Sequence, residues 1–366
     1  MRPLSLDVDL SKRIQSIRFL LISLIVLRHN ILTEVRFPGR IEIVVIPEYM
    51  TIVQTVCNII ISSAVPLFSI ISSYLLYSKE IKFISVLKKK SKTILLPYIL
   101  WTVLTLLFFF IAQNISLTKT YFASNLIKDF TVIDWIDAFV GKFTPLRDYQ
   151  YPLLYHFHFL RDLYILSLLS IVIKKIVDRF PLGTILLFFI IWIGNINIYL
   201  VAPRMLLFFS LGYYAVKYSL DCRTIDQIKT YNIFVLYAII IIMNLFFGEK
   251  IPIIFNICVL TGVTLFIKTT KYFINNDKIF NLLSRLAKYS FFVFATHSVV
   301  LAIVNKISFK IFSIHGGWIL VQYFGGTFLT ISILALVGAL IRKSFPKTYA
   351  ILTGGRLYDQ NLLIKP

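Results

Sequence analysis

Charged residues are scarce in this sequence, and acidic ones scarcer still. Charged side chains make up 15% of the 366 residues, against 58% apolar and 16% aromatic residues. A soluble domain carries about 25% charged and about 45–50% apolar residues. A soluble fold of this length could not bury the apolar excess, so the composition excludes a soluble enzyme and a disordered chain. It predicts a protein that crosses a membrane several times.

Cysteine is also rare. Cys57, Cys222 and Cys258 show no paired spacing, so we expect neither a disulfide framework nor a metal site built on cysteine. Cys57 and Cys258 lie in apolar runs, where a free thiol serves as a small packing residue. The opening MRPLSLDVDLSKR is polar and acidic, which is not the pattern of a signal peptide.

The shortage of acidic residues leaves a large positive charge. Lys and Arg number 38 and Asp and Glu 17, which gives a net charge of +21. In a soluble protein this excess would suggest nucleic acid as a partner, but no basic motif with interleaved aromatics is present. We therefore expect no nucleic-acid partner and assign the charge to cationic loops beside a lipid bilayer.

Ten apolar segments are candidates for transmembrane helices, which need about 20 mostly apolar residues. The sixth is the shortest, and a re-entrant segment is its alternative. We expect an all-α polytopic membrane protein with about ten transmembrane helices. The segments are Ile14–Leu32, Val56–Tyr77, Ile94–Ile111, Phe157–Ile173, Leu182–Val201, Met205–Tyr218, Tyr231–Phe247, Ile251–Ile267, Tyr289–Val304 and Trp318–Ile341.

The positive charges alternate between the two sides of this arrangement. With a cytoplasmic N-terminus, the inner loops and segment ends hold 25 Lys and Arg and the outer loops hold 10, while Arg18, Arg28 and Arg161 lie within segments. Cytoplasmic loops of membrane proteins are enriched in Lys and Arg. The alternation predicts two cytoplasmic termini, one transmembrane domain over residues 1–345 and a cytoplasmic tail over residues 346–366.

The longest outer stretch runs from Ala112 to His156 and is aromatic and mixed in charge. Its segment NLIKDFTVIDWIDAFVGKF is amphipathic, which predicts a helix lying at the membrane interface.

Arg18 and His29 are the first polar residues of interest, because a charge within an apolar segment usually faces a partner or a water-filled cavity. At about 100° and 1.5 Å per residue, they lie about 20° apart around a helix and about 16 Å apart along it. One face would thus carry Arg18 toward the cytoplasm and His29 toward the outside. The alternatives are an Arg18 that extends to the inner interface and an interfacial His29.

Further polar residues occur around the fourth and ninth segments. His156 and His158 border the fourth, and Arg161 and Asp162 lie within it. Neighbours on a helix do not face each other, so we expect Arg161 and Asp162 to find separate partners, structural or substrate. His297 lies in the middle of the ninth segment, where it is either a site residue or a neutral histidine bonded across helices.

A lysine cluster precedes the third segment. Lys88, Lys89, Lys90 and Lys92 come shortly before a helix that begins near Pro97. A cationic cytoplasmic surface favours an anionic nucleotide, and the alternative is a cluster that sets topology or binds lipid.

Together these motifs resemble those of the acyltransferase-3 family of integral membrane acyltransferases. That family opens with an arginine and a histidine separated by ten residues, as RFLLISLIVLRH does here. Further motifs follow in the family's order between about residues 13 and 345. They are PLFSIISSYLLY, KKKSKTILLPYILW, HFHFLRDLYILSLLS, RMLLFFSLGYYAVK and SFFVFATHSVVL.

The resemblance implies transfer of an acyl group, commonly acetyl, from cytoplasmic acetyl-CoA or another acyl-CoA. The acceptor would be a hydroxyl of a surface or lipid-linked glycan, and the location a bacterial cytoplasmic membrane. No metal is implied, and no oligomeric state is indicated. The resemblance implies a catalytic pair of His29 as general base and Arg18 as donor-orienting residue. The basic positions expected near the CoA phosphates are Lys89, Lys90, Lys92 and Arg161, and further candidates without an assigned role are His297, His156 and Ser72.

Three positions depart from the family pattern. Gln15 replaces an aspartate, lysines stand where arginines are common, and Ser73 replaces a glycine. Lysine lacks the bidentate phosphate geometry of arginine. Only about 25 residues follow Ile341, so we expect no C-terminal esterase-like domain of the kind that some members carry.

Two other functions stay open at this point. Acidic residues in the first outer loop, Glu34, Glu42 and Glu48, are compatible with a membrane glycosyltransferase or polysaccharide polymerase. That alternative leaves the lysine cluster and the interval from Arg18 to His29 unexplained. A glycan transporter is the second alternative, but no paired halves with Gly or Pro breaks are visible.

Overall fold

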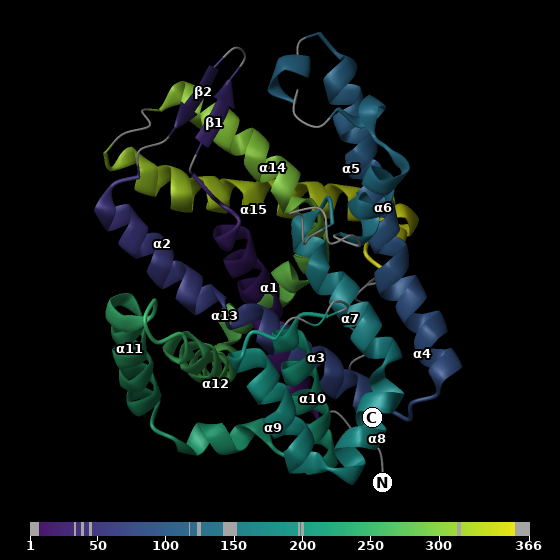
Figure 1. Ribbon diagram of the computed structural model, residues 1–366, viewed down its shortest axis with the longest axis vertical. Coiled ribbons are helices and arrows are strands. Elements are labelled where there is room, and N and C mark those ends of the chain that lie inside the picture. Colours follow the sequence, from purple (N-terminus) through teal and green to yellow (C-terminus); the bar gives the residue numbers. More distant parts are fainter. Residues whose placement is uncertain are drawn as a thin grey trace.

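The computed structural model is helical apart from one small hairpin (Figure 1). It describes residues 7–32, 34–37, 40–43, 46–116, 118–122, 126–141, 152–196, 198, 201–312 and 316–355. Residues 1–6 of the predicted domain and residues 356–366 of the predicted tail lie outside the described part. The side chains of Glu34 and Glu42, two of the acidic residues of the first outer loop, also lie outside it.

The first half of the chain contains the opening helix, the hairpin and the helices that lead into the long outer stretch. Its helices and strands are α1 (Val8–Arg28), β1 (Glu34–Phe37), β2 (Arg40–Ile43), α2 (Glu48–Ile61), α3 (Ala64–Tyr77), α4 (Phe83–Lys90), the π-helical turn η1 (Ser91–Leu95), α5 (Leu96–Asn114), η2 (Lys119–Tyr121), η3 (Ile127–Asp129), α6 (Val132–Val140), η4 (Tyr155–Phe157) and α7 (His158–Leu168).

The second half consists of helices joined mostly by short turns. They are α8 (Ser170–Arg179), α9 (Pro181–Ile193), α10 (Pro203–Lys217), η5 (Cys222–Gln227), α11 (Thr230–Phe247), α12 (Ile253–Asn275), α13 (Asp277–Ala287), α14 (Ser290–Ile311), α15 (Trp318–Ser344) and α16 (Pro346–Leu352).

A helix lies in each of the ten apolar segments predicted from the sequence. Among the described residues, six continuous helical stretches are long and apolar enough to cross a membrane, and α8 with α9, bent by 118°, forms a possible seventh. These helices make the chain a multi-pass membrane protein. A count of ten crossings and the side on which each terminus lies stay predictions.

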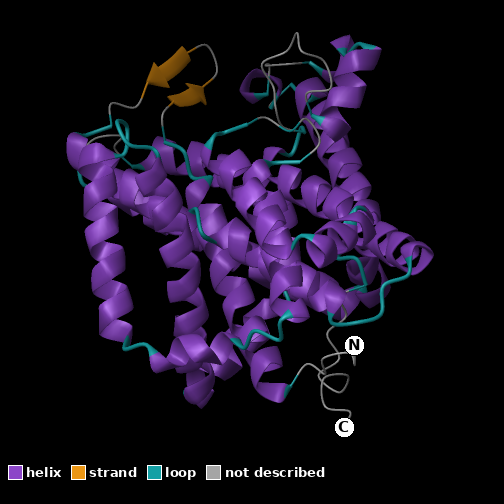
Figure 2. Ribbon diagram, turned by 60° about the horizontal axis from the view of Figure 1, so that its bottom comes forward, coloured by secondary structure: helices purple, strands orange, loops and turns teal. Residues whose placement is uncertain are grey.

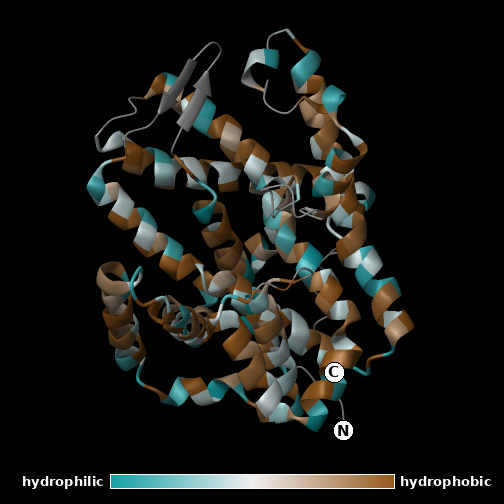
Figure 3. Ribbon diagram, viewed as in Figure 1, coloured by the Kyte–Doolittle hydropathy of each residue, from teal (hydrophilic) through white to brown (hydrophobic). Residues whose placement is uncertain are grey.

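Hydrophobic residues predominate along α5, α11 and α15 (Figure 3). Large side chains on these helices are highly exposed, including Phe246 at 75% and Phe328 at 73%. In water such a surface would be unfavourable, whereas acyl chains of a bilayer cover it at no cost in hydration.

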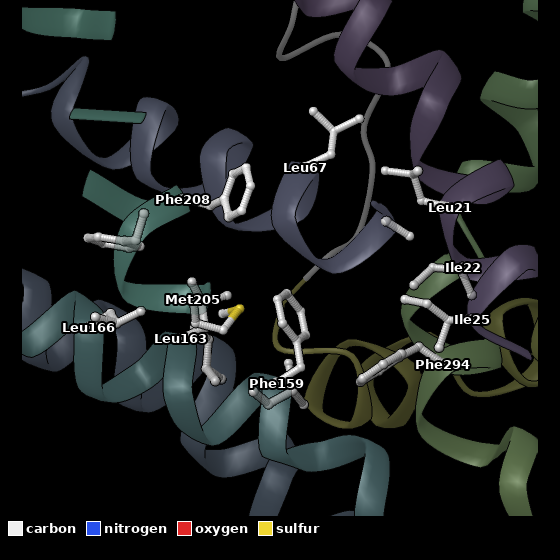
Figure 4. Close-up of a cluster of buried hydrophobic side chains, with 14 of the residues drawn as sticks. Leu21, Ile22, Ile25, Leu67, Phe159, Leu163, Leu166, Met205, Phe208 and Phe294 are labelled. Carbon is white, nitrogen blue, oxygen red and sulfur yellow. The ribbon is translucent and has the colours of Figure 1, made fainter. Parts of the chain in front are cut away.

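Helix α1 lies at the centre of the bundle and contacts α2, α3, α12, α13, α14 and α15. It is 21 residues long and begins with an Asp7 cap whose carboxylate accepts a hydrogen bond from the Leu10 amide at 2.7 Å. Figure 4 shows Leu21, Ile22 and Ile25 of α1 turned toward Leu67 of α3 and Phe294 of α14. The middle of α1 is therefore enclosed by protein.

Helices α3 and α10 approach each other closely through small residues. The hydroxyl of Ser73 donates to the Phe209 carbonyl, and a Cβ added at Gly212 would lie 2.6 Å from the Ile70 carbonyl oxygen. Ser73, which replaces the family glycine, thus joins the two helices, while its neighbour Ser72 is partly exposed.

The hairpin of β1 and β2 is a departure from the all-α prediction (Figure 2). Glu34 pairs with Ile43 and Phe37 with Arg40 in an antiparallel register. The predicted amphipathic helix of the long outer stretch is present as α6, and a capping box between Thr131 and Asp134 starts it.

The first ten residues after the predicted domain boundary fold onto the bundle. Tyr349 of α16 is fully buried and donates from its hydroxyl to the Lys288 carbonyl at 2.9 Å. The Trp101 indole of α5 donates to the Leu352 carbonyl at 2.9 Å. Residues 346–355 therefore pack against the helix bundle through Tyr349 and Leu352. The side of the membrane on which they lie stays a prediction.

Candidate active site at the end of the first helix

Three histidines from distant parts of the chain meet beside the C-terminal end of α1. His29 caps α1, His156 lies in η4 and His297 lies in α14. The ring centroids of His29 and His297 are 5.1 Å apart and nearly parallel, and those of His156 and His297 are 4.3 Å apart. The Tyr155 ring packs edge-on against His29 at 4.6 Å. The structure thus brings together three predicted candidates.

A chain of hydrogen bonds fixes the protons on two of these rings. Nδ1 of His297 lies 2.7 Å from the Phe294 carbonyl oxygen, and a carbonyl can only accept. His297 Nδ1 therefore carries the proton, and its Nε2 has a free lone pair in the neutral ring. Nδ1 of His29 lies 2.9 Å from that Nε2, so His29 donates from Nδ1. In the neutral ring the remaining nitrogen, His29 Nε2, then holds an unprotonated lone pair.

Burial separates the two partners of this pair. His297 is fully buried, whereas His29 is partly exposed. His297 is thus enclosed and oriented by its own helix, while the ring with the free lone pair is the accessible one. A partner histidine that accepts from Nδ1 orients the His29 ring and would stabilise an imidazolium if Nε2 took a proton.

His156 fills an aromatic environment next to the pair. It is 1% exposed, and its ring lies edge-on to Phe157 at 4.9 Å and to Phe294 at 5.2 Å. Neither of its ring nitrogens makes a hydrogen bond of normal geometry within the described part of the chain. The structure places His156 at the site without giving it a chemical role.

Arg18 lies on the same uninterrupted helix as His29 and is partly buried. A cavity of about 650 Å³ opens one turn away on the N-terminal side, between α1, α3, α10 and α12. Ile14 and Ile17 of α1 form part of its wall. At its rim Arg13 donates to Asp226 at 2.6 Å and to Asp9 at 2.7 Å. The cavity is large enough for a small molecule, but neither Arg18 nor His29 is among the residues that line it.

The lysine cluster lies on another helical stretch. Lys89 and Lys92 are exposed, and Lys90 is partly buried. The stretch changes from α-helix to the π-helical turn η1 at Ser91, whose hydroxyl lies 3.0 Å from that of Tyr164 in α7. π-helical turns are rare and often accompany functional sites. These lysines border the bundle without joining the histidines.

Arg161 and Asp162 do find separate partners as predicted, but the expectation that they would not face each other is wrong. Arg161 folds back over its neighbour and donates from Nη2 to Asp162 at 3.0 Å. Each also binds another element, since Arg161 Nη1 donates to the Val140 carbonyl at 2.6 Å and Asp162 accepts from the Ala202 amide at 3.0 Å. Asp162 is fully buried, and an unpaired buried carboxylate is costly. The Arg161 side chain therefore bends back to pair with it, although neighbours on a helix do not normally face each other.

Two residues of the site escaped sequence reasoning. Tyr155 packs against His29, and Asn30, the residue after His29, is buried. Asn30 is a polar residue at the end of an apolar run, which was the available sign of a buried contact. The sequence could not show which residues it contacts, because they lie far along the chain. Within the described residues, no group of three or more His, Cys, Asp or Glu is arranged to hold a metal ion.

The fold and site define a multi-pass membrane protein with an oriented histidine pair enclosed by its helices. Over residues 11–340 the sequence matches the acyltransferase-3 family, described as an acyltransferase domain, and the chain belongs to that family. A curated relative is the succinoglycan biosynthesis protein ExoH of Rhizobium meliloti (strain 1021). It is 26% identical over 317 residues, which cover 82% of this chain and 81% of the relative. No solved structure matches the chain significantly.

Proposed function

We propose that the protein transfers an acetyl group from cytoplasmic acetyl-CoA to a hydroxyl of a surface or lipid-linked glycan at the outer face of a bacterial cytoplasmic membrane. Family membership supports acyl transfer, and the relative named for succinoglycan biosynthesis supports a glycan acceptor. The observation that carries the chemical part of the proposal is the hydrogen bond of 2.9 Å between His29 Nδ1 and His297 Nε2.

In the proposed reaction His29 is the general base. Its Nε2 lone pair takes the proton of the acceptor hydroxyl while that oxygen bonds to the thioester carbonyl carbon. The carbonyl electrons move to oxygen, then return as the carbon–sulfur bond breaks. The CoA thiolate leaves with the proton from His29 Nε2, and an ester remains on the acceptor. His297 accepts from His29 Nδ1 throughout, which holds the ring in the productive tautomer.

The donor would approach from the opposite end of α1. The cavity beside Ile14 and Ile17 of α1 has apolar walls on α1, α3 and α12 and a polar rim, which suits the slender, partly apolar arm of CoA. In this proposal Arg18 attracts or orients the donor. Lys89, Lys90 and Lys92 provide positive charge for its phosphates, as point charges without bidentate geometry.

Comparison of surface glycans from cells with and without the gene tests the proposal. We expect loss of an acetyl mass increment at unchanged chain length when the gene is deleted, and its return with the wild-type gene. A change in chain length with normal acetylation would indicate a polymerase instead. Normal acetylation and normal length, with the glycan retained inside the cell, would indicate a transporter. Either of these last results contradicts the proposal.

A further inference from the structure

The end of α1 is held in place by an amide that the reaction itself does not use. Asn30 follows His29 directly and is 1% exposed. Its side-chain nitrogen donates to the Tyr323 carbonyl at 2.7 Å, to Thr327 Oγ1 at 3.1 Å and, more weakly, to the Gln322 carbonyl at 3.3 Å. Its side-chain oxygen accepts from Asn305 Nδ2 at 2.9 Å. One side chain thus joins α1 to both α14 and α15.

His29 needs such an anchor because of its place in the helix. It is the C-terminal cap of α1, and the backbone amides of Asn30 and Ile31 bond back only to Leu27 and His29. The last turn of a helix frays when nothing else holds it. Without Asn30, the frayed last turn would leave the His29 ring free to move relative to His297.

Two consecutive residues at the end of α1, its cap His29 and the following Asn30, bond to the same neighbouring helix. His29 donates to His297 of α14, and Asn30 accepts from Asn305 of α14. Asn305 follows His297 by eight residues, or about 12 Å along the helix. Two attachment points at different heights fix both the distance and the rotation of α1 relative to α14, and a single one fixes only the distance.

From these contacts we infer that Asn30 is a positioning residue, which holds His29 in hydrogen-bond reach of His297 by tying the end of α1 to α14 and α15. Its buried amide, with four partners, is costly to disturb, because removing it leaves the Asn305 amide nitrogen without the acceptor it binds. The inference rests on the proposed function for its catalytic meaning, but the geometry it concerns can be measured separately.

A glycine beside the amide provides a gentle probe. A Cβ at Gly326 would lie 3.3 Å from Asn305 Oδ1 and 3.7 Å from Asn30 Nδ2. Its neighbour Gly325 is exposed, and a Cβ there would meet only Val321 at 3.8 Å. Gly326→Ala and Gly325→Ala are therefore matched changes that both favour the helix, since alanine is the better helix former. Only the first presses on the Asn305 amide that binds Asn30, while its contact with Asn30 itself is an ordinary van der Waals one.

The test compares Asn30→Ala, Gly326→Ala and Gly325→Ala in two assays. The first is acetyl transfer from labelled acetyl-CoA to endogenous acceptor in membranes, per folded protein. The second is the ring nitrogen spectrum of protein labelled with ¹⁵N-histidine, where the chain's five histidines keep the spectrum simple. Signals of the bonded His29 and His297 nitrogens are assigned with His29→Ala and His297→Ala.

We expect Asn30→Ala to lower turnover by about 10- to 100-fold and to abolish the spectral signature of the bonded pair. Gly326→Ala should lower turnover several-fold, about three to ten, and shift the same signals. Gly325→Ala should change neither. Wild-type turnover in Asn30→Ala, or lost turnover with an unchanged histidine signature, would overturn the inference. An active His29→Ala variant would contradict the proposed function instead, while the spectra would still decide whether Asn30 holds the pair.

Discussion

At the scale of single residues, the proton positions on two rings determine which nitrogen of His29 carries a free lone pair. The Phe294 carbonyl orients His297, and His297 orients His29, so a backbone group at one end decides which nitrogen is free at the other. A neutral accepting histidine thus takes the place that a carboxylate has in many hydrolases. It avoids burying a negative charge deep among apolar helices.

The activity left after replacement of His297 should therefore depend on whether the new side chain can accept a hydrogen bond from His29. His297→Leu removes the acceptor and should lower transfer by about 10²- to 10⁴-fold, because His29 loses its tautomer and orientation. His297→Gln places an amide oxygen near the Nε2 position and should keep more activity than His297→Leu. Rates per folded protein measure this. Equal rates for the two variants would mean that His297 acts only by filling space.

The interval from Arg18 to His29 predicted one helix for both, and the structure has it. No feature of the sequence indicated that His297, 268 residues later, would bond to His29. Local spacing predicts which residues share a face of one helix, whereas contacts between helices depend on how the whole bundle packs. Asn30 escaped prediction for the same reason, since its partners lie on α14 and α15.

At the scale of elements, the contact between α3 and α10 depends on small residues. A Cβ at Gly212 would lie 2.6 Å from the Ile70 carbonyl oxygen and 2.7 Å from the Ser73 Cβ. A backbone carbonyl cannot yield without moving the helix, so any side chain at this position would force α3 and α10 apart. Close approach of backbones through glycine and serine is a common way for helices to associate in a membrane.

Gly212→Ala should accordingly destabilise the bundle by about 1–3 kcal/mol. Gly183→Ala on α9 is the control, because a Cβ there would have its nearest neighbour at 3.9 Å. Thermal unfolding of the two variants in detergent gives the comparison. A Gly212→Ala protein as stable as Gly183→Ala would show that α3 and α10 separate more easily than their contacts suggest.

At the scale of the whole molecule, charge and hydropathy determine which surface meets lipid and which side each loop faces. The exposed apolar side chains of α5, α11 and α15 follow directly from the composition. The number of membrane crossings does not follow from the composition, because α1 carries five charged residues and the pair α8 and α9 is sharply bent. Such helices cross a membrane only where the protein itself surrounds their polar groups.

Cysteine labelling would test the predicted orientation. Cys222 lies in the loop between α10 and α11, predicted to be cytoplasmic, and burial raises the pKa of its thiol. Its reaction with a membrane-impermeant maleimide should therefore be slow at neutral pH and faster as the pH rises, since the thiolate reacts. In cells, labelling of Cys222 should be detected only after the membrane has been permeabilised.

Gly317→Cys supplies the opposite control for that experiment. Gly317 is exposed before α15, with open space around a Cβ, in a loop predicted to face outward. With Cys57 and Cys258 replaced by alanine, intact cells should label Gly317→Cys and spare Cys222. Labelling of Cys222 in intact cells would contradict the orientation on which the proposed path of the acyl group depends.

The role of His29 as the base is tested by acetyl incorporation into the surface glycan of cells that produce His29→Ala in place of the wild type, with protein levels matched in the membrane. If His29 is the base, mass spectra should show no acetyl increment, while the variant accumulates and inserts normally. A glycan acetylated to the wild-type extent would show that another group takes the hydroxyl proton.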